Sequence, residues 1–321
     1  MIRRKPLLTL AVLALALTGC AAYIDERAET RAEAAERRYP PTGRLLQIDG
    51  KTVHAHVEGQ GPDLVLIHGA SGNTRDFTFD LVGRLRDDYR VIAFDRPGLG
   101  WTDRLDTGND SPLAQADLLR RAADRLGVRD PVVLGHSYGG AVAMAWALQA
   151  PERTGAIVLL AGATHPWPDD VSLGAFYPFI TSPVGRAAVP LISAFAPESR
   201  VEQALAGIFA PNPVPDGYMD HVGAGLTLRR ESFLANARQV DNLKPYLERM
   251  APRYASLDLP IEIVHGARDT TVGLDYHSRR MARLPNAELT VLPQVGHMVH
   301  HAAPQAVLAA IDRAARRAGL R

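Results

Sequence analysis

The 321-residue chain is predicted to be an α/β protein: a mostly parallel eight-stranded sheet with helices on both faces and an inserted helical lid. Short apolar runs alternate with helical patterns, which is typical of a parallel sheet wrapped by helices. The alternation stops between about residues 166 and 259, where prolines and helix-like segments occur without a clear strand. The sequence Gly135-His136-Ser137-Tyr138-Gly139 ends one apolar run and begins a helix.

Two strand-like runs come first, and six apolar bursts follow, each with the length of a strand buried on both faces. The expected strands are 45–49, 52–58, 64–67, 91–94, 132–134, 157–160, 261–264 and 289–292. Helical patterns predict helices at about 75–86, 112–126, 138–149, 276–283 and 304–316. The core is therefore expected to comprise residues 44–165 and 260–321, with residues 166–259 as the lid.

Charge and cysteine content exclude several classes of function. The chain has 36 Lys and Arg against 35 Asp and Glu, a formal net charge of +1, so it carries no field that would hold nucleic acid. A single cysteine excludes an internal disulfide and a Cys-based zinc site. No metal-ligand spacing and no Gly-rich phosphate loop is present, and we expect neither a metal nor a cofactor.

The first 20 residues have the pattern of a secretory signal. A basic start at Arg3, Arg4 and Lys5 precedes residues 6–18, which are uncharged and too short to span a bilayer. The following Leu17-Thr18-Gly19-Cys20 resembles the bacterial lipobox. An ordinary signal peptide with a chance cysteine is the alternative.

The lipobox resemblance implies that residues 1–19 are removed as a lipoprotein signal peptide and that Cys20 is lipidated. Acyl chains would then hold the protein to a membrane of the bacterial cell envelope by burying methylenes. Ala21 after the cysteine implies the outer membrane if the host is Gram-negative. Cleavage would remove three positive charges, so the net charge would change from +1 to −2 (1 − 3).

Residues 20–43 are expected to form the lipid anchor and a tether. Glu33 and Arg37 have the i,i+4 spacing that favours a helix, and Pro40-Pro41 would end it. Because the segment has no continuous apolar stripe, we expect a solvated spacer. A partner-binding helix is the alternative.

Ser137 is the candidate nucleophile. The G-x-S-x-G turn between a strand and a helix forces a strained backbone at the serine, and Gly135 and Gly139 keep side chains clear of it. The hydroxyl then projects beyond the carboxyl ends of the strands, towards the positive end of the following helix. An incidental serine in a glycine-rich turn is the alternative.

Four further segments resemble motifs of the α/β-hydrolase family in order and spacing. Leu66–Gly72 resembles its oxyanion loop, Asp95–Gly100 the turn after its fourth strand, His265–Asp269 its acid loop, and Val295-Gly296-His297 its histidine loop. The resemblance extends from about residue 44 to 318. It implies the chain order nucleophile, acid, base.

We expect His297 to be the catalytic base and Asp269 the acid. A serine hydroxyl is a weak nucleophile near neutral pH and needs a base to take its proton. A buried carboxylate must hold that histidine in the correct tautomer, and Asp269 lies just beyond an expected strand end.

Other residues could fill these roles. His300 and His301 are competing bases, for which surface or capping roles are the simpler expectation. Asp258 and Asp275 are competing acids, expected as solvated charges or caps. Asp269 itself could be only a helix N-cap.

The backbone N–H groups of Ala70 and Tyr138 are the expected oxyanion hole, because acyl transfer needs two preset donors for the developing charge. His68 is expected to hold this loop rather than to transfer protons. Asp95 and Arg96 are expected as turn and ion-pair residues.

The expected function is a serine hydrolase that cleaves an ester, or a related acyl bond, of a small to medium hydrophobic substrate through an acyl-enzyme. C–C bond hydrolysis and cofactor-free perhydrolysis on the same triad are alternatives, and a non-catalytic lipid-anchored binding protein is a third. Epoxide hydrolases and haloalkane dehalogenases are disfavoured, since those relatives use a carboxylate at the position of Ser137. The oligomeric state is not predicted.

Lid residues could line an apolar pocket or form the lid's own core: Trp167, Phe176, Tyr177, Phe179, Ile180, Phe195, Ile208, Phe209 and Tyr218.

Overall fold

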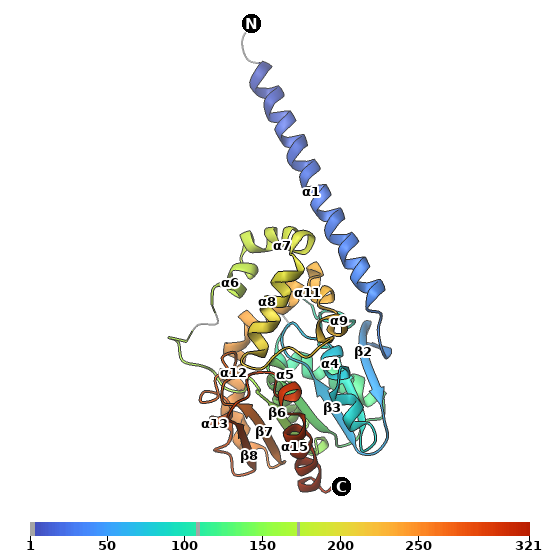
Figure 1. Ribbon diagram of the computed structural model, residues 1–321, viewed down its shortest axis with the longest axis vertical. Helices are drawn as coiled ribbons and strands as arrows, with labels where there is room; N and C mark the ends of the chain where they lie inside the picture. The colour runs from blue at the N-terminus through green and yellow to red at the C-terminus, as the bar shows by residue number, and fades with distance from the viewer. Residues whose placement is uncertain (1–3, 107–109, 172–173) are drawn as a thin grey trace.

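An eight-stranded sheet organises the fold in the computed structural model, which describes residues 4–106, 110–171 and 174–321 (Figure 1). Its strands follow the spatial order β1-β2-β4-β3-β5-β6-β7-β8. β2 pairs antiparallel with β1 and β4, and all other pairs are parallel. The predicted fold class is therefore confirmed. The strands are β1 Arg44–Ile48, β2 Lys51–Glu58, β3 Asp63–Ile67, β4 Arg90–Phe94, β5 Val132–His136, β6 Ala156–Leu160, β7 Ile261–Gly266 and β8 Ala287–Leu292.

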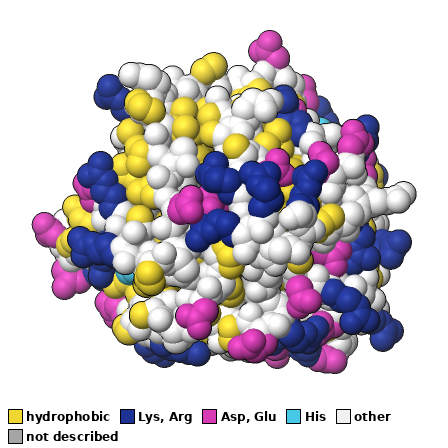
Figure 2. All heavy atoms as spheres, turned by 90° about the horizontal axis from the view of Figure 1, so that it is seen from below, with side chains coloured by type: hydrophobic (Ala, Val, Ile, Leu, Met, Phe, Trp, Pro, Cys, Tyr) yellow, Lys and Arg dark blue, Asp and Glu magenta, His cyan; other side chains and the backbone are white. Residues whose placement is uncertain are grey.

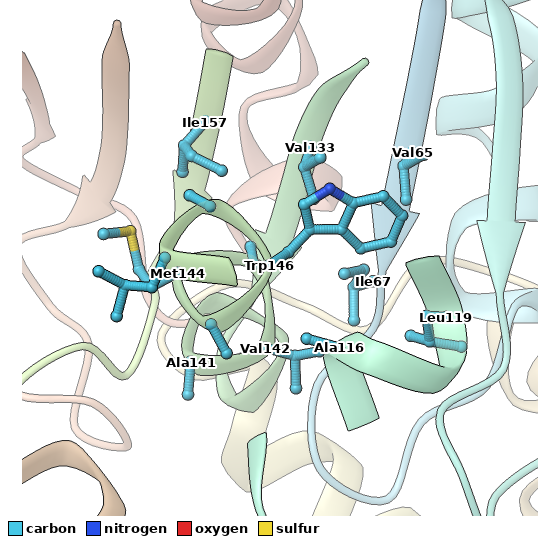
Figure 3. Close-up of a cluster of buried hydrophobic side chains, with 14 of the residues drawn as sticks. Val65, Ile67, Ala116, Leu119, Val133, Ala141, Val142, Met144, Trp146 and Ile157 are labelled. Carbon is cyan, nitrogen blue, oxygen red and sulfur yellow. The ribbon is translucent and has the colours of Figure 1, made fainter. Parts of the chain in front are cut away.

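Alternate residues of each central strand face opposite sides of the sheet, as the two-residue period of a strand requires. In β3, Val65 and Ile67 pack in one apolar cluster, whereas Leu64 and Leu66 pack in the other. The first cluster includes α4 (Pro112–Arg125) and α5 (Tyr138–Gln149), and Figure 3 shows Trp146 of α5 beside Val65 and Val133. The second includes α2 (Arg75–Thr78), α3 (Leu81–Leu85) and α15 (Pro304–Arg317).

The strand order places the topological switch point between β3 and β5. The chain leaves β3 for β4 on one side, and β5 lies on the other side of β3. Loops diverge at such a point and leave a crevice beyond the carboxyl ends of the strands, where α/β proteins bind ligands. The loop after β3 and the turn containing Ser137 both lie there.

A helical insertion separates β6 from β7, and its described residues include no strand. It corresponds to the region predicted as the lid. Its elements are α6 Phe176–Thr181, α7 Pro183–Phe195, α8 Glu198–Phe209, α9 Tyr218–Val222, α10 Ala224–Thr227, α11 Arg230–Asp241, α12 Leu243–Met250 and the short helix η2 Ala251–Ser256.

Two predicted helices are shorter than expected. The segment 75–86 is divided into α2 and α3 at Phe79-Asp80, because the backbone of Asp80 leaves the helical region at φ −147°. Only α13 (Ser278–Met281) forms within 276–283. The remaining short helices are η1 (Pro151–Arg153) and α14 (Val299–Ala302).

The N-terminal segment is one continuous helix, α1 (Arg4–Arg38), and its second half is docked rather than solvated. Arg27 and Arg31 donate to the carbonyls of Ala194 and Ala196 at 3.1 and 2.9 Å. Ala28 is buried beneath them. The expected solvated spacer was therefore wrong: polar contacts, which an apolar-stripe criterion does not detect, attach this helix to the insertion.

Ion pairs extend that attachment along α1. Glu36 pairs with Arg229 at 2.8 Å, and Asp25 pairs with Arg230 at 3.0 Å. Within the described part of the chain, no helix has the length and hydropathy needed to cross a membrane.

Candidate active site

The backbone of Ser137 is strained, as the motif predicts, with φ 53° and ψ −121°. Its N–H donates to the carbonyl of Leu160 at 2.9 Å, and its carbonyl accepts from Ala163 at 2.9 Å, so β6 holds the turn in place. A side chain at Gly139 would collide with the backbone of Ile67. These contacts fix the turn at the start of α5 and aim the serine into the switch-point crevice.

Asp269 and His297 form a buried pair. His297 Nδ1 donates to Asp269 Oδ2 at 2.8 Å, and Asp269 Oδ1 accepts from the N–H groups of Thr271 and Val272 at 2.7 and 3.0 Å. Burial alone would raise the pKa of Asp269, but hydrogen bonds from His265 and His297 outweigh it and hold that pKa well below 3.8. The acid is therefore charged at neutral pH, and the proton on Nδ1 leaves His297 Nε2 free to accept another.

His265 is a second histidine on Asp269 that the sequence reasoning did not assign. Its Nε2 lies 3.1 Å from Asp269 Oδ2 and 2.9 Å from the carbonyl of Val272, while its Nδ1 lies 2.6 Å from Ser278 Oγ. Both oxygens facing Nε2 are acceptors, so the proton belongs on Nε2 and Nδ1 accepts from the hydroxyl. His265 thus holds the carboxylate in place. Its position in the His265–Asp269 motif was the available signal.

His136, the residue before Ser137, packs directly against His297. Their rings are 4.8 Å apart, and His136 Nε2 lies 3.3 Å from the carbonyl of His297. The serine turn and the histidine loop therefore meet at one rim of the sheet. Among the described residues no hydrogen bond joins Ser137 Oγ to His297, and in unliganded sites this bond often tightens only with substrate.

The expected oxyanion donors, Ala70 and Tyr138, line the same cavity as Ser137. In the described part of the chain neither backbone N–H donates to a protein acceptor. The loop that carries Ala70 is held from the insertion, because the N–H of Ser71 donates to Asn236 Oδ1 of α11 at 2.7 Å. Two free donors beside a nucleophile have the chemistry of an oxyanion hole.

Arg96 supports the oxyanion loop from behind. It donates to the carbonyls of His68 and Gly69, both at 3.0 Å, and its guanidinium lies 4.2 Å from the ring centre of Tyr138. Burial lowers its pKa to about 10, so it remains a cation. The expected ion pair is not observed: among the described residues no carboxylate contacts Arg96, and carbonyls, amides and a ring take that place.

His68 and Asp95 hold the same loops, as expected. His68 Nδ1 donates to the carbonyl of Gly69, and its Nε2 accepts from the N–H of Arg96 at 2.9 Å. Burial lowers the pKa of His68 to about 4, so the ring is neutral. Asp95 accepts from His54 Nδ1 at 2.7 Å and from two backbone N–H groups.

His300 and His301 are not surface or capping residues, contrary to expectation. Both are bound to Asp76, with Nε2 to carboxylate distances of 3.1 and 2.8 Å, and Tyr218 donates to the same carboxylate at 2.8 Å. Burial raises the pKa of Asp76, but the two histidines reverse this and hold it well below 3.8. No motif marks Asp76 as their partner, because it lies more than 200 residues before them in the chain.

Asp76, His300 and His301 are the one group within the described residues whose ligand atoms lie close enough together to hold a metal ion. The carboxylate is already satisfied by three donors, and His300 Nδ1 lacks the partner that orients a metal-bound histidine. The cluster therefore acts as a hydrogen-bond network.

The competing acids Asp258 and Asp275 are exposed, and Asp275 pairs with Arg279 at 2.7 Å.

A cavity of about 460 Å³ opens beside Ser137. None of its lining residues among those described is Lys, Arg, Asp or Glu. Burial lowers the pKa of His277 to about 3, so this lining histidine is neutral as well. A larger cavity of about 640 Å³ lies between α1 and the body, but no candidate catalytic residue lines it. The lining residues of the smaller cavity are Ala70, Ser137, Tyr138, Ala163, Trp167, Val171, Tyr177, Val240, Leu243, Thr270, Thr271, Val272, Gly273, Tyr276 and His277.

A doubly wound sheet with a strained serine turn after β5 and an Asp–His pair beyond β7 and β8 defines a hydrolase scaffold. The model of the alpha/beta hydrolase family matches residues 64–310, more than half of the chain. The protein therefore belongs to the alpha/beta hydrolase family.

Related proteins cover most of the chain. The 2-hydroxy-6-oxononadienedioate/2-hydroxy-6-oxononatrienedioate hydrolase of Klebsiella pneumoniae is 27% identical over 274 residues, 80% of this chain and 89% of that protein. An alpha/beta hydrolase fold protein from Burkholderia ambifaria superposes with a TM-score of 0.71 at 25% identity, covering 84% of this chain and 97% of that one. A meta-cleavage product hydrolase from Pseudomonas fluorescens gives 0.63 at 25% identity, covering 85% and 97%.

Proposed function

We propose that the protein is a serine hydrolase in which Ser137, His297 and Asp269 form the catalytic triad. His297 Nε2 takes the proton of the Ser137 hydroxyl as the oxygen attacks the substrate carbonyl, and Asp269 stabilises the imidazolium that forms. The N–H groups of Ala70 and Tyr138 bind the oxyanion. His297 then gives its proton to the leaving alcohol, and water cleaves the acyl-enzyme by the reverse sequence.

The preferred substrate is a neutral, hydrophobic carboxylic ester of small to medium size. The main support is that the cavity beside Ser137 is lined mostly by aromatic and aliphatic side chains, and that none of its described lining residues is Lys, Arg, Asp or Glu. Burying an unpaired anion in such a cavity would be costly, whereas burying a neutral acyl chain is favourable. A volume of about 460 Å³ accommodates a small to medium molecule.

C–C bond hydrolysis is the second candidate, favoured by the names of the related proteins. Those names describe dienoate and dienedioate substrates, which carry carboxylates. The same triad could cleave such a bond, but the described lining of the cavity contains no cation to hold the carboxylate. The neutral ester is therefore the better match to this site.

Competition between the two substrate classes tests this proposal. Nitrophenyl esters graded by acyl length and a carboxylated dienoate are assayed with the full chain, with Ser137→Ala as the blank. We expect kcat/KM for the best neutral ester to exceed that for the dienoate by at least about tenfold, the factor that 1.4 kcal/mol supplies. The reverse order would assign the protein to C–C hydrolysis.

We also propose that Cys20 carries a lipid that anchors the protein to the cell envelope. The lipobox-like sequence supports this, and the structure leaves Cys20 free and exposed. Cys20→Ser should release the protein from the membrane fraction of the bacterial host. A variant that stays membrane-bound would show that the anchor lies elsewhere.

A further inference from the structure

The outer face of α6 and α7 is apolar although it is exposed. Nine large hydrophobic side chains are exposed among those that the structure describes, and seven of them lie on α1, α6 or α7. On α7, Val184 and Leu191 are 71% and 50% exposed and are separated by seven residues, so they lie on one face of the helix. Phe176 and Phe179 of α6 are 53% and 48% exposed. We call these four residues together with Phe195 the α6–α7 face.

The exposed apolar side chains are not explained by packing within the insertion, because α6 and α7 each have a second, buried apolar side. Ile180 of α6 and Val189 of α7 are fully buried against α11, so the core-facing side of each helix is already apolar. Helices at a protein surface ordinarily turn polar residues outward. Contiguous exposed apolar side chains mark an interaction site.

The α6–α7 face is almost uncharged. The sequences of α6 and α7 contain no Asp or Glu, and Arg186 is their single charged residue. The opposite side of the molecule is different, because Figure 2, which views it from below, shows Lys, Arg, Asp and Glu side chains across it. A nearly uncharged apolar face can enter the lipid headgroup region, whereas burying the many charges of the opposite face there would be costly.

The position of Cys20 identifies the occupant of this face. The ring of Tyr23 on α1 lies 6.5 Å from the ring of Phe195, and Cys20 lies three residues earlier on the same helix, about 4.5 Å along its axis. Because α1 is docked from there onward, no flexible linker separates Cys20 from the rest of the protein. A lipid on Cys20 would therefore keep this end of the molecule close to the bilayer. The N-terminal part of α1 projects past α7 from this end of the molecule (Figure 1).

We propose that the α6–α7 face docks on the phospholipid bilayer, so that the enzyme takes ester substrates that are dissolved in the membrane. This rests on the proposed hydrolase function and on the proposed anchor. Tyr177 lines the cavity beside Ser137, while its neighbours Phe176 and Phe179 face outward, so α6 connects the bilayer surface to the active site. Apolar side chains are what an interfacial helix buries at the boundary between headgroups and acyl chains.

Site-specific quenching tests the docking directly. Cys20 is the sole cysteine, and acylation blocks its thiol, so a cysteine introduced into the anchored protein can be labelled uniquely. The lipidated Val184→Cys, Leu191→Cys and Leu45→Cys variants are labelled with bimane in vesicles of phosphatidylethanolamine and phosphatidylglycerol that contain nitroxide lipid. Leu45 is the matched control, 49% exposed on β1.

Bimane at positions 184 and 191 should lose most of its fluorescence, and bimane at position 45 should keep it. Anchored protein without quenching at 184 and 191 overturns the docking while the anchor stands. If Cys20 carries no lipid, nothing brings the α6–α7 face to a bilayer, and the docking is overturned together with the anchor.

Turnover separates docking from catalysis. Leu191→Glu in the anchored protein should reduce turnover of an ester dissolved in the vesicle by about tenfold and leave turnover of a water-soluble ester unchanged. Leu45→Glu should change neither. Equal loss on both esters, or loss on neither, would overturn membrane delivery of substrate. Absence of all ester turnover, in the wild type too, would instead refute the proposed function.

Discussion

At the scale of single residues, the electrostatic centre of the site is Asp269. Its side chain is fully buried, yet two histidines and two backbone N–H groups compensate its charge. A carboxylate with this many donors stays ionised in an apolar setting. It can therefore fix the tautomer of His297 throughout the proposed reaction.

Replacing Asp269 by Asn should lower kcat by about 10⁴-fold, with little change in KM. An amide can donate to His297 Nδ1, which moves the ring proton to Nε2 and removes the base that faces Ser137. Steady-state ester hydrolysis measures this effect. Asp275→Asn, an exposed carboxylate six residues further on, is the control and should retain full activity. A loss below about tenfold in Asp269→Asn would contradict the tautomer argument.

The sequence predicted the candidate site residues that belong to motifs, because the family spacing and the strand ends place them. Structure places Asp269 on His297 and both Ala70 and Tyr138 beside Ser137. The sequence did not predict the buried hydrogen-bond networks around these residues. Asp76 meets His300 and His301 across more than 200 residues of chain, and no local pattern encodes such a meeting.

At the scale of elements, the insertion contacts the oxyanion loop, whereas α1 contacts the insertion. Helix α11 reaches the oxyanion loop directly through Asn236, and it holds Arg96 behind the loop through Gln239. Within the described part of the chain, helix α1 does not contact that loop; it contacts the end of α7 through Arg27 and Arg31 and the start of α11 through the ion pair of Asp25 with Arg230. Helix α11 therefore positions the oxyanion loop, whereas α1 supports the insertion.

Ala28→Glu should detach α1 from α7. Ala28 is buried between the two arginines that bind the α7 carbonyls, and a long charged side chain cannot fit there. A loss of about 1.4 kcal/mol would raise the open population tenfold, so trypsin should cut the arginines of α1 about ten times faster.

The control for this variant is Ala34→Glu, at an exposed position of the same helix. Both changes lower helix propensity by the same small amount, so only the interface distinguishes them. Equal cleavage rates in the two variants would mean that α1 is not held by this contact.

The helical insertion and the strands could be predicted from periodicity, whereas the docking of α1 could not. Burial of a strand leaves an apolar run that is visible in the sequence. Helix α1 instead binds through arginine donors, ion pairs and one small residue, Ala28, and such a surface has the composition of a solvated helix.

At the scale of the whole molecule, stability should fall as the pH falls below 7. The pKa values of His68 and His277 are lowered to about 4 and about 3 by burial, from 6.5 in the unfolded chain. Between about pH 4 and 6.5 the unfolded state therefore binds more protons than the folded state, and acidification favours unfolding. Each such proton contributes up to about 1.4 kcal/mol per pH unit.

Urea unfolding at pH 7.5, 6 and 5 measures this dependence. The midpoint should decrease at each step, and the lowered pKa values of Asp76 and Asp269 extend the loss to still lower pH. A midpoint that is constant or increases from pH 7.5 to 5 would show that these histidines are not buried in neutral form.

The measurement that most directly tests the central assignment is covalent trapping with a fluorophosphonate, followed by peptide mass spectrometry. We predict a single phosphonyl adduct on Ser137, formed in the wild-type protein and lost in His297→Ala although that variant remains folded. An adduct on another residue, or unchanged labelling of Ser137 without His297, would contradict the proposed Ser–His–Asp chemistry.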